Sequence, residues 1–166
     1  NSMNDLPRVH VLLVNYNGWR DTLECLESIF RLDYPDFRVV VCDNGSSDGS
    51  LERIRTWAEG TQPATPSPIA ISSTVGDTPV RKPIRYVLGD RAQAEAGTLP
   101  DADAQLVLVR LEENRGFTGG NNVGLRYLRA RGDAGLVWIL NNDTVVDPSS
   151  LREMVARLEE SPDVAA

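Results

Sequence analysis

The run VHVLLVN at residues 9–15 decides the fold, because it is apolar along almost its whole length and ends in a polar residue. A strand buried on both faces of a parallel sheet has this composition, whereas a strand with one face in water alternates apolar and polar residues. Three similar runs follow: FRVVVC at 37–42, LVLVRL at 106–111 and LVWIL at 136–140. We therefore predict four buried strands.

Each predicted strand precedes a segment with apolar residues at helical spacing. After the first strand these residues are Trp19, Leu23, Leu26 and Phe30. Four strand–helix units predict an α/β fold with a mainly parallel sheet, right-handed crossovers and helices on both faces. We expect Asn17 and Asp147 to be N-caps, with Pro148 at the first helical position, and Gly132 to be a left-handed C-cap.

The chain has 166 residues, a length that favours one domain, and the stretch at 61–105 differs from the rest. Six of the ten prolines fall between 61 and 100, so we predict an irregular insertion at 61–105. Its short apolar pieces at 69–71 and 84–88 are candidate edge strands. We expect residues 163–166 to begin a further strand that the chain cuts short.

Composition excludes some classes of function. The formal net charge is −7, which disfavours a nucleic-acid binder because such proteins need a basic surface. The sequence has no apolar run of about 18 residues that could cross a membrane. Cys25 and Cys42 lie in apolar patterns, so we expect buried free thiols and a cytoplasmic protein.

Polar clusters follow all four predicted strands. They are Asn15-Tyr16-Asn17, Asp43-Asn44-Gly45-Ser46, Asn114-Arg115-Gly116 and Asn141-Asn142-Asp143. The carboxyl ends of parallel strands form the ligand-binding edge of an open α/β sheet, so these clusters predict one site. Amide, carboxylate and phenol groups suit a base and a ribose. Asp143 offers a hard oxygen ligand for the Mg²⁺ or Mn²⁺ that a diphosphate requires.

The sequence disfavours several other kinds of site. The chain contains no P-loop motif, and no G-x-G-x-x-G follows the first strand. The stretch beginning at Asp43 lacks the glycine and glutamate of a calcium loop, since Ile54 stands at the twelfth position. His10 is the only histidine and lies on a buried strand, so we interpret it as structural rather than catalytic or zinc-binding.

Four segments, VHVLLVNYNG, VVVCDNGSSDGS, ENRGFTGGNNVGL and VWILNNDTVVDP, resemble successive motifs of the family-2 glycosyltransferases, which have a GT-A (Rossmann-like) fold. The chain is most similar to the rhamnosyltransferase-like bacterial branch, whose members build cell-surface polysaccharides. The resemblance covers residues 9–60 and 106–166. It implies an inverting transferase that takes a UDP- or dTDP-sugar and passes the sugar to the hydroxyl of a glycan or lipid-linked acceptor.

The resemblance also implies roles for individual residues. Asn15, Tyr16 and Asn17 would line the base and ribose pocket. Asp43 would accept a hydrogen bond from the pyrimidine N–H, with Asn44 and Ser46 nearby, and Arg115 and Asn121 would close the other side. Asn141-Asn142-Asp143 stands where the family has its D-x-D motif, so Asp143 would bind the metal and Asn142 would lie beside the nucleotide.

In the family, the general base lies well downstream of the D-x-D position, so we expect no catalytic base within these residues and interpret the chain as a truncated, donor-binding portion. We expect it to be inactive in transfer and to form a homo-oligomer through an exposed sheet edge. A cytoplasmic location, or one at the inner face of the membrane, would follow. Two alternatives remain open: a sugar nucleotidyltransferase, which usually has a basic glycine-rich loop absent here, and a non-catalytic nucleotide-binding module.

Overall fold

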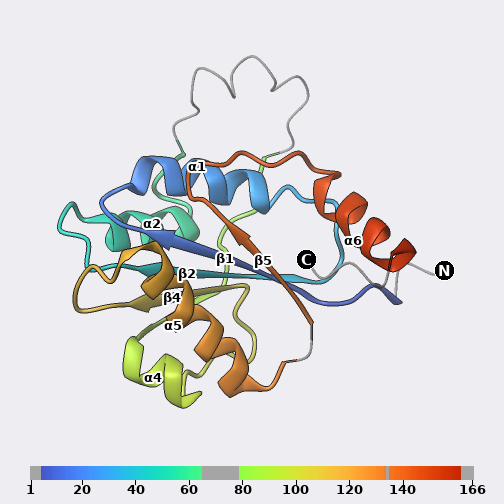
Figure 1. Cartoon of the computed structure of the whole chain (residues 1–166). Coiled ribbons are helices and arrows are strands. Elements are labelled where there is room, and N and C mark those ends of the chain that lie inside the picture. The colour runs from blue at the N-terminus through green and yellow to red at the C-terminus, as the bar shows by residue number, and fades with distance from the viewer. Residues whose placement is uncertain (1–4, 65–78, 134, 162–166) are drawn as a thin grey trace.

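A computed structural model describes residues 5–64, 79–133 and 135–161. Its centre is a five-stranded parallel sheet with the order β3-β4-β2-β1-β5 (Figure 1). The strands are β1 (Val9–Asn15), β2 (Phe37–Asp43), β3 (Tyr86–Asp90), β4 (Leu106–Arg110) and β5 (Leu136–Leu140). The helices are α1 (Trp19–Ile29), α2 (Ser50–Glu59), α4 (Arg91–Ala96), α5 (Gly116–Arg131) and α6 (Ser150–Glu160). The predicted α/β class with a parallel sheet is confirmed.

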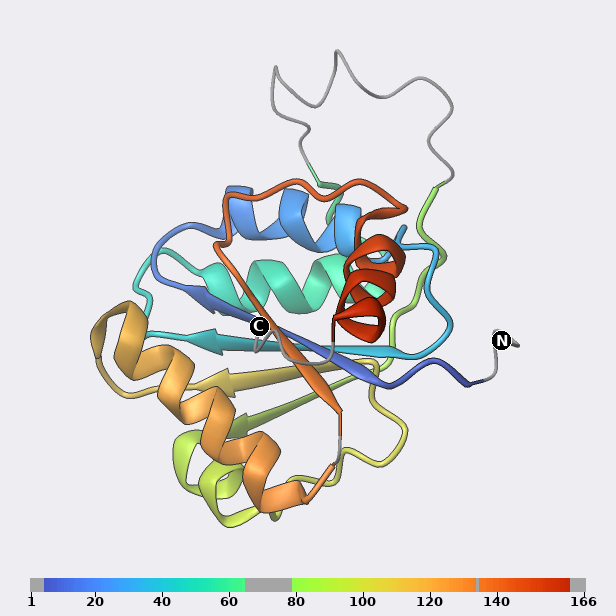
Figure 2. The ribbon, with the colours of Figure 1, turned by 45° about the vertical axis from the view of Figure 1, so that its right-hand side comes forward.

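Helices cover both faces of the sheet, as predicted (Figure 2). On one face α1, α2 and α6 pack through residues such as Leu26, Trp57 and Leu151. On the other face α4 and α5 form a second core with Tyr127 and Val123 at its centre. Successive residues of β1 divide between the two cores: Val11 and Leu13 belong to the first and Leu12 to the second. This division explains why VHVLLVN carries apolar residues on both faces.

The stretch at 61–105 is not irregular throughout, which corrects part of the prediction. β3 pairs in parallel with β4 at the edge of the sheet, two residues later than the strand expected at 84–88. The short helix α4 follows it directly. Asp90 caps this helix by accepting a hydrogen bond from the Gln93 N–H at 2.8 Å, and the Gln93 side-chain oxygen accepts a bond from the Asp90 N–H at 3.0 Å. The candidate strand at 69–71 and the strand start at 163–166 lie outside the described residues.

Two of the predicted helix caps are wrong. α1 begins after Gly18, and Asn17 adopts a φ of 47° while its carboxamide oxygen accepts a hydrogen bond from the Ser47 N–H at 2.8 Å. Asn17 therefore joins two loops instead of capping the helix. α6 begins after Ser149, because Asp147 accepts bonds from Ser149 in the preceding turn. The left-handed C-cap at Gly132 is confirmed, with a φ of 69°.

Candidate functional site

Three of the predicted site residues form a hydrogen-bonded cluster at the carboxyl ends of β1 and β2. The sheet register pairs Asn15 with Asp43. Asn15 donates from Nδ2 to Asp43 Oδ1 at 2.8 Å and to Ser46 Oγ at 3.2 Å. Ser46 donates to Asp43 from both its hydroxyl, at 2.7 Å, and its backbone N–H, at 3.2 Å. Asn15 and Asp43 are buried, so this cluster is held in place before any ligand arrives.

The cluster extends towards β5 through Thr22 of α1. The Thr22 hydroxyl donates to Asn15 Oδ1 at 2.7 Å and accepts a bond from Asn142 Nδ2 at 3.1 Å. A Cβ atom on Gly18 would lie 3.0 Å from Asn142 Nδ2, so the glycine leaves room for this approach. The structure thereby brings Asn142 to the same edge of the sheet as Asn15 and Asp43.

On the other side of the cluster, Asn44 ties β2 to the start of α5. Its Nδ2 donates to the Gly116 carbonyl at 2.9 Å, and its Oδ1 accepts a bond from the Arg115 N–H at 3.3 Å. The Arg115 side chain is exposed. Asn121, five residues after Gly116 on α5, is 7% exposed, and its Oδ1 has no hydrogen-bond partner within the described part of the chain. Asn121 therefore keeps an unused acceptor close to the site.

Three predicted residues are exposed at this edge. Tyr16 is 50% exposed, and Asn17 and Asp143 are also open to solvent. Across residues 5–64, 79–133 and 135–161, no group of three His, Cys, Asp or Glu side chains is arranged to hold a metal ion. A cation held by Asp143 would therefore need other oxygen ligands, from amide or backbone carbonyl groups, from a bound molecule or from water.

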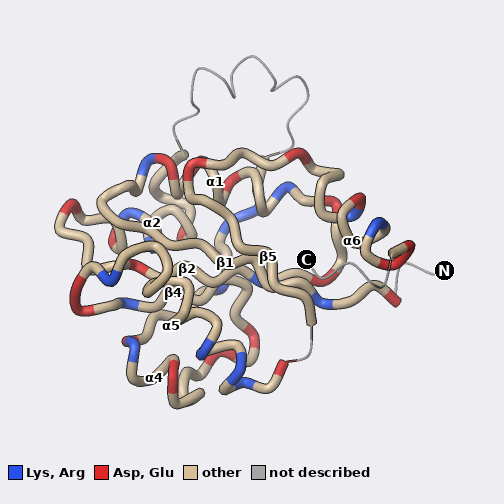
Figure 3. Tube along the Cα trace, viewed as in Figure 1, with Lys and Arg blue, Asp and Glu red and all other residues tan. Residues whose placement is uncertain are grey.

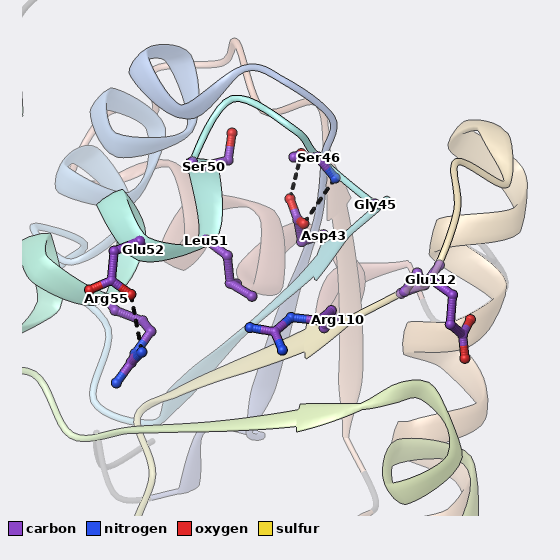
Figure 4. A pocket seen from close by; sticks show the side chains of 11 residues that line it. Asp43, Gly45, Ser46, Ser50, Leu51, Glu52, Arg55, Arg110 and Glu112 are labelled. Atoms are coloured by element: carbon purple, nitrogen blue, oxygen red, sulfur yellow. Dashed lines mark hydrogen bonds and ion pairs between the residues drawn. The ribbon is translucent and has the colours of Figure 1, made fainter.

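A pocket of about 400 Å³ opens beside Asp43 and Ser46 (Figure 4). Its charged lining includes residues that the sequence analysis missed: Glu52, Arg55, Arg110 and Glu112. Arg110 is the last residue of β4 and pairs in register with Asp43. Only the strand order and register place it there, and neither is visible in the sequence.

A second polar network lies at the opposite, amino ends of the strands. Asp101 bonds both the Tyr127 hydroxyl and the Arg131 guanidinium, and Arg131 also pairs with Asp133 at 3.0 Å. Burial alone would raise the pKa of Asp101, but the bonds from Tyr127 and Arg131 hold it below its usual value. Figure 3 shows basic and acidic residues side by side at this end of α5. The network joins α5 to the loops that precede β4 and β5.

The histidine and the two cysteines fit a structural interpretation. His10 is buried within β1, and burial lowers its pKa. Cys25 and Cys42 are free and buried, and burial raises the pKa of each thiol to about 12. Such thiols are poor nucleophiles at neutral pH. Among the described helices, none is long and apolar enough to span a membrane.

Comparison with known proteins agrees with this architecture. The EpsE protein of Bacillus subtilis (strain 168), whose name describes it as a glycosyltransferase, is 36% identical over 56 residues, which are 34% of this chain and 20% of EpsE. The mannosyltransferase PcManGT from Pyrobaculum calidifontis, solved with GDP-Man and Mn²⁺, matches with a TM-score of 0.59 and 24% identity over 95% of this chain and 34% of its own.

S. aureus TarS, residues 1–349, solved alone and with UDP-GlcNAc, matches with a TM-score of 0.52 and 18% identity. The match covers 92% of this chain and about a third of TarS 1–349, that is 32% for the structure solved alone. At these identities the solved structures show the fold alone. The sequence model of Glycosyl transferase family 2 matches residues 10–70 and 89–166, well over half of the sequence, and the chain therefore belongs to glycosyl transferase family 2.

Proposed function

We propose that the edge formed by Asn15, Asp43 and Ser46 binds a nucleoside diphosphate sugar, and that the chain supplies the donor-binding part of an inverting glycosyltransferase. The preformed hydrogen-bonded cluster is the observation that carries this proposal. A site whose polar side chains are already ordered loses little conformational entropy when a ligand binds. Family membership makes a nucleotide sugar the first ligand to test.

The surrounding residues divide into groups that suit the parts of such a donor. Asp43 is a carboxylate acceptor for a ring N–H, with Asn44 and Ser46 beside it. Exposed Tyr16 offers an aromatic face for a base, and Asn17 lies next to it. Arg115 and Asn121 lie at the start of α5, on the opposite side of Asp43 from Asn142.

A divalent cation fits the carboxylate on the β5 side of the edge. Mg²⁺ is commonly bound through one or two carboxylates together with substrate phosphates. Asp143 supplies such a carboxylate, exposed and on the chain that follows β5. We propose that Asp143 holds Mg²⁺ or Mn²⁺ against the donor diphosphate, where the cation would stabilise the charge of the departing nucleoside diphosphate. PcManGT, which shares the fold, was solved with Mn²⁺.

We propose a UDP- or dTDP-sugar as the donor and the hydroxyl of a glycan or lipid-linked molecule as the acceptor, in the cytoplasm. Two neighbours carry related ligands in their solved forms: UDP and UDP-GlcNAc in TarS, and GDP-Man in PcManGT. The free buried thiols of Cys25 and Cys42 support the location, because disulfides are rare in that compartment.

Calorimetric titration of the chain with UDP, dTDP and GDP, each with and without MnCl₂, tests the proposal. We expect binding that Mn²⁺ strengthens in the parent and in a control variant, Asp103→Ala, which removes an exposed carboxylate from the opposite end of the sheet. Asp143→Ala should bind the nucleotide with no response to Mn²⁺. An equal Mn²⁺ response in Asp143→Ala would remove the metal assignment, and absence of nucleotide binding by the parent would remove the proposed function.

A further inference from the structure

The pocket beside Asp43 contains more charged groups than the donor site proposed above, and most of them already have partners. Arg55 donates to Glu52 at 3.1 Å and to the Tyr86 hydroxyl at 3.3 Å. Glu112 forms an ion pair with Arg91 at 3.3 Å. These pairs neutralise one another, so they leave little capacity for a ligand.

Arg110 is the exception. Within the described part of the chain its guanidinium forms no hydrogen bond or ion pair, although carboxylates stand on both sides of it in the sheet register: Asp43 on β2 and Asp90 on β3. Asp90 instead caps α4. The Arg110 side chain extends from the end of β4 into the pocket, on the same side as Arg55 (Figure 4). A guanidinium has five N–H donors, and no described residue uses any of those of Arg110.

Asp43 retains one unused hydrogen-bond acceptor position that faces the same pocket as Arg110. Its Oδ1 accepts bonds from both Asn15 and Ser46, whereas, among the described residues, its Oδ2 accepts a bond only from the Ser46 N–H. A carboxylate has about four lone-pair positions, so one remains on Oδ2. Neighbouring strands lie about 4.8 Å apart, which places this acceptor within the reach of a ring that also touches a side chain from β4.

We propose that Arg110 determines which base the site accepts: Asp43 accepts the ring N–H, and Arg110 donates to the carbonyl beside it that cytosine and adenine lack, which is O4 of uracil or thymine and O6 of guanine. The Asp43 carboxylate is an acceptor and the Arg110 guanidinium beside it is a donor. Together they complement a base edge in which an N–H lies next to a C=O, and uracil, thymine and guanine present such an edge. Cytosine and adenine have the inverse pattern, a bare ring nitrogen beside an amino group, which would face Asp43 with an acceptor and Arg110 with a donor. The inference rests on the proposed function, because it assumes a nucleotide at this edge.

UDP and CDP provide a matched pair of probes, since they share the ribose, diphosphate and O2 and differ only at N3 and C4 of the ring. Calorimetry at constant MnCl₂ should show that the parent chain binds UDP about tenfold or more tightly than CDP. Arg110→Ala should lose about tenfold in UDP affinity and little in CDP affinity. Arg110→Lys, which keeps a donor, should recover part of the preference for UDP.

Arg129→Ala is the control, because Arg129 is an exposed arginine near the far end of α5. It should leave both affinities unchanged. Equal losses of UDP and CDP affinity in Arg110→Ala would overturn the inference, because the guanidinium would then contact a part that the two ligands share. Equal UDP and CDP affinities in the parent would also overturn it and leave the proposed function standing, whereas a parent that binds neither nucleotide would refute both.

Discussion

Replacing Asp43 with Asn tests the centre of the proposed site with minimal change in shape. Asp43 Oδ1 accepts the two shorter bonds, at 2.7 Å from Ser46 and 2.8 Å from Asn15, so the amide oxygen of Asn should take that place. The amide nitrogen then falls at the position of Oδ2. There it faces the Ser46 N–H and any ring N–H of a ligand, and in both cases a donor opposes a donor.

The expected loss of ligand affinity is larger than the expected loss of folding stability. A hydrogen bond to a charged acceptor contributes about 1.5–3 kcal/mol, so Asp43→Asn should weaken UDP binding by about 10- to 100-fold. The bond from the Ser46 N–H is longer, at 3.2 Å, and its loss should reduce the free energy of unfolding by about 1 kcal/mol. The ligand therefore loses more than the fold.

Calorimetry with UDP and urea unfolding measure these effects separately. Asp48→Asn is the matched control, because the Asp48 carboxylate also accepts a backbone N–H, from Ser50 at 2.9 Å, and does not line the pocket. It should lower stability and leave UDP affinity unchanged. The reasoning fails if folded Asp43→Asn binds UDP within about twofold of the parent, because Asp43 would then only stabilise its loop.

Three further expectations concern the rest of the molecule. Gly124→Ala would place a Cβ 2.4 Å from Leu12 Cδ1, and we expect the overpacking to cost about 1–3 kcal/mol in urea unfolding; an unchanged midpoint would contradict this close approach. Burial lowers the pKa of His10 below 6.5, so the unfolded chain binds a proton that the folded chain does not, and stability should fall as pH drops below about 6.5. His10→Gln should flatten that part of the pH profile between pH 7.5 and 5, and an identical slope would exclude His10 as its source. Val137 and Ile139 of edge strand β5 are 40% and 43% exposed, so we expect self-association in light scattering that Val137→Lys with Ile139→Lys reduces, and a monomeric parent would refute it.

Much of the fold could be predicted because β1, β2 and β4 are buried on both faces and therefore consist mainly of apolar residues. The prediction that LVWIL is also buried is wrong, because β5 lies at the edge of the sheet and exposes Val137 and Ile139. β3 and α4 were harder to predict, since YVLGD lies in a proline-rich stretch and a six-residue helix is too short to show a periodic pattern. The two wrong caps have a common cause. Asn17 and Asp147 bond to nearby backbone N–H groups outside the helices, an alternative that short polar side chains always have.

The candidate site could be predicted to the same extent. Polar residues directly after a strand must lie at its carboxyl end, so the placement of Asn15, Asp43 and Asn142 at one edge could be predicted from position alone. That these residues bind a ligand stays a prediction. Arg110 was missed because its place depends on β4 pairing next to β2, which no local pattern reveals. The role of Asp143 stays a prediction, since its side chain is exposed and belongs to no group of three His, Cys, Asp or Glu side chains among the described residues.

Helix α5 connects the two polar ends of the sheet, and this has a consequence for the order in which the native protein opens. Its first residues are held by Asn44, its last turns by Asp101, and its middle lies against Leu12. Amide hydrogens of α5 and the three central strands should therefore exchange with solvent last, while α4 and α6 open in small local fluctuations. Motions on the β5–α6 side could then admit and release a ligand without disturbing the hydrogen bonds around Asp43.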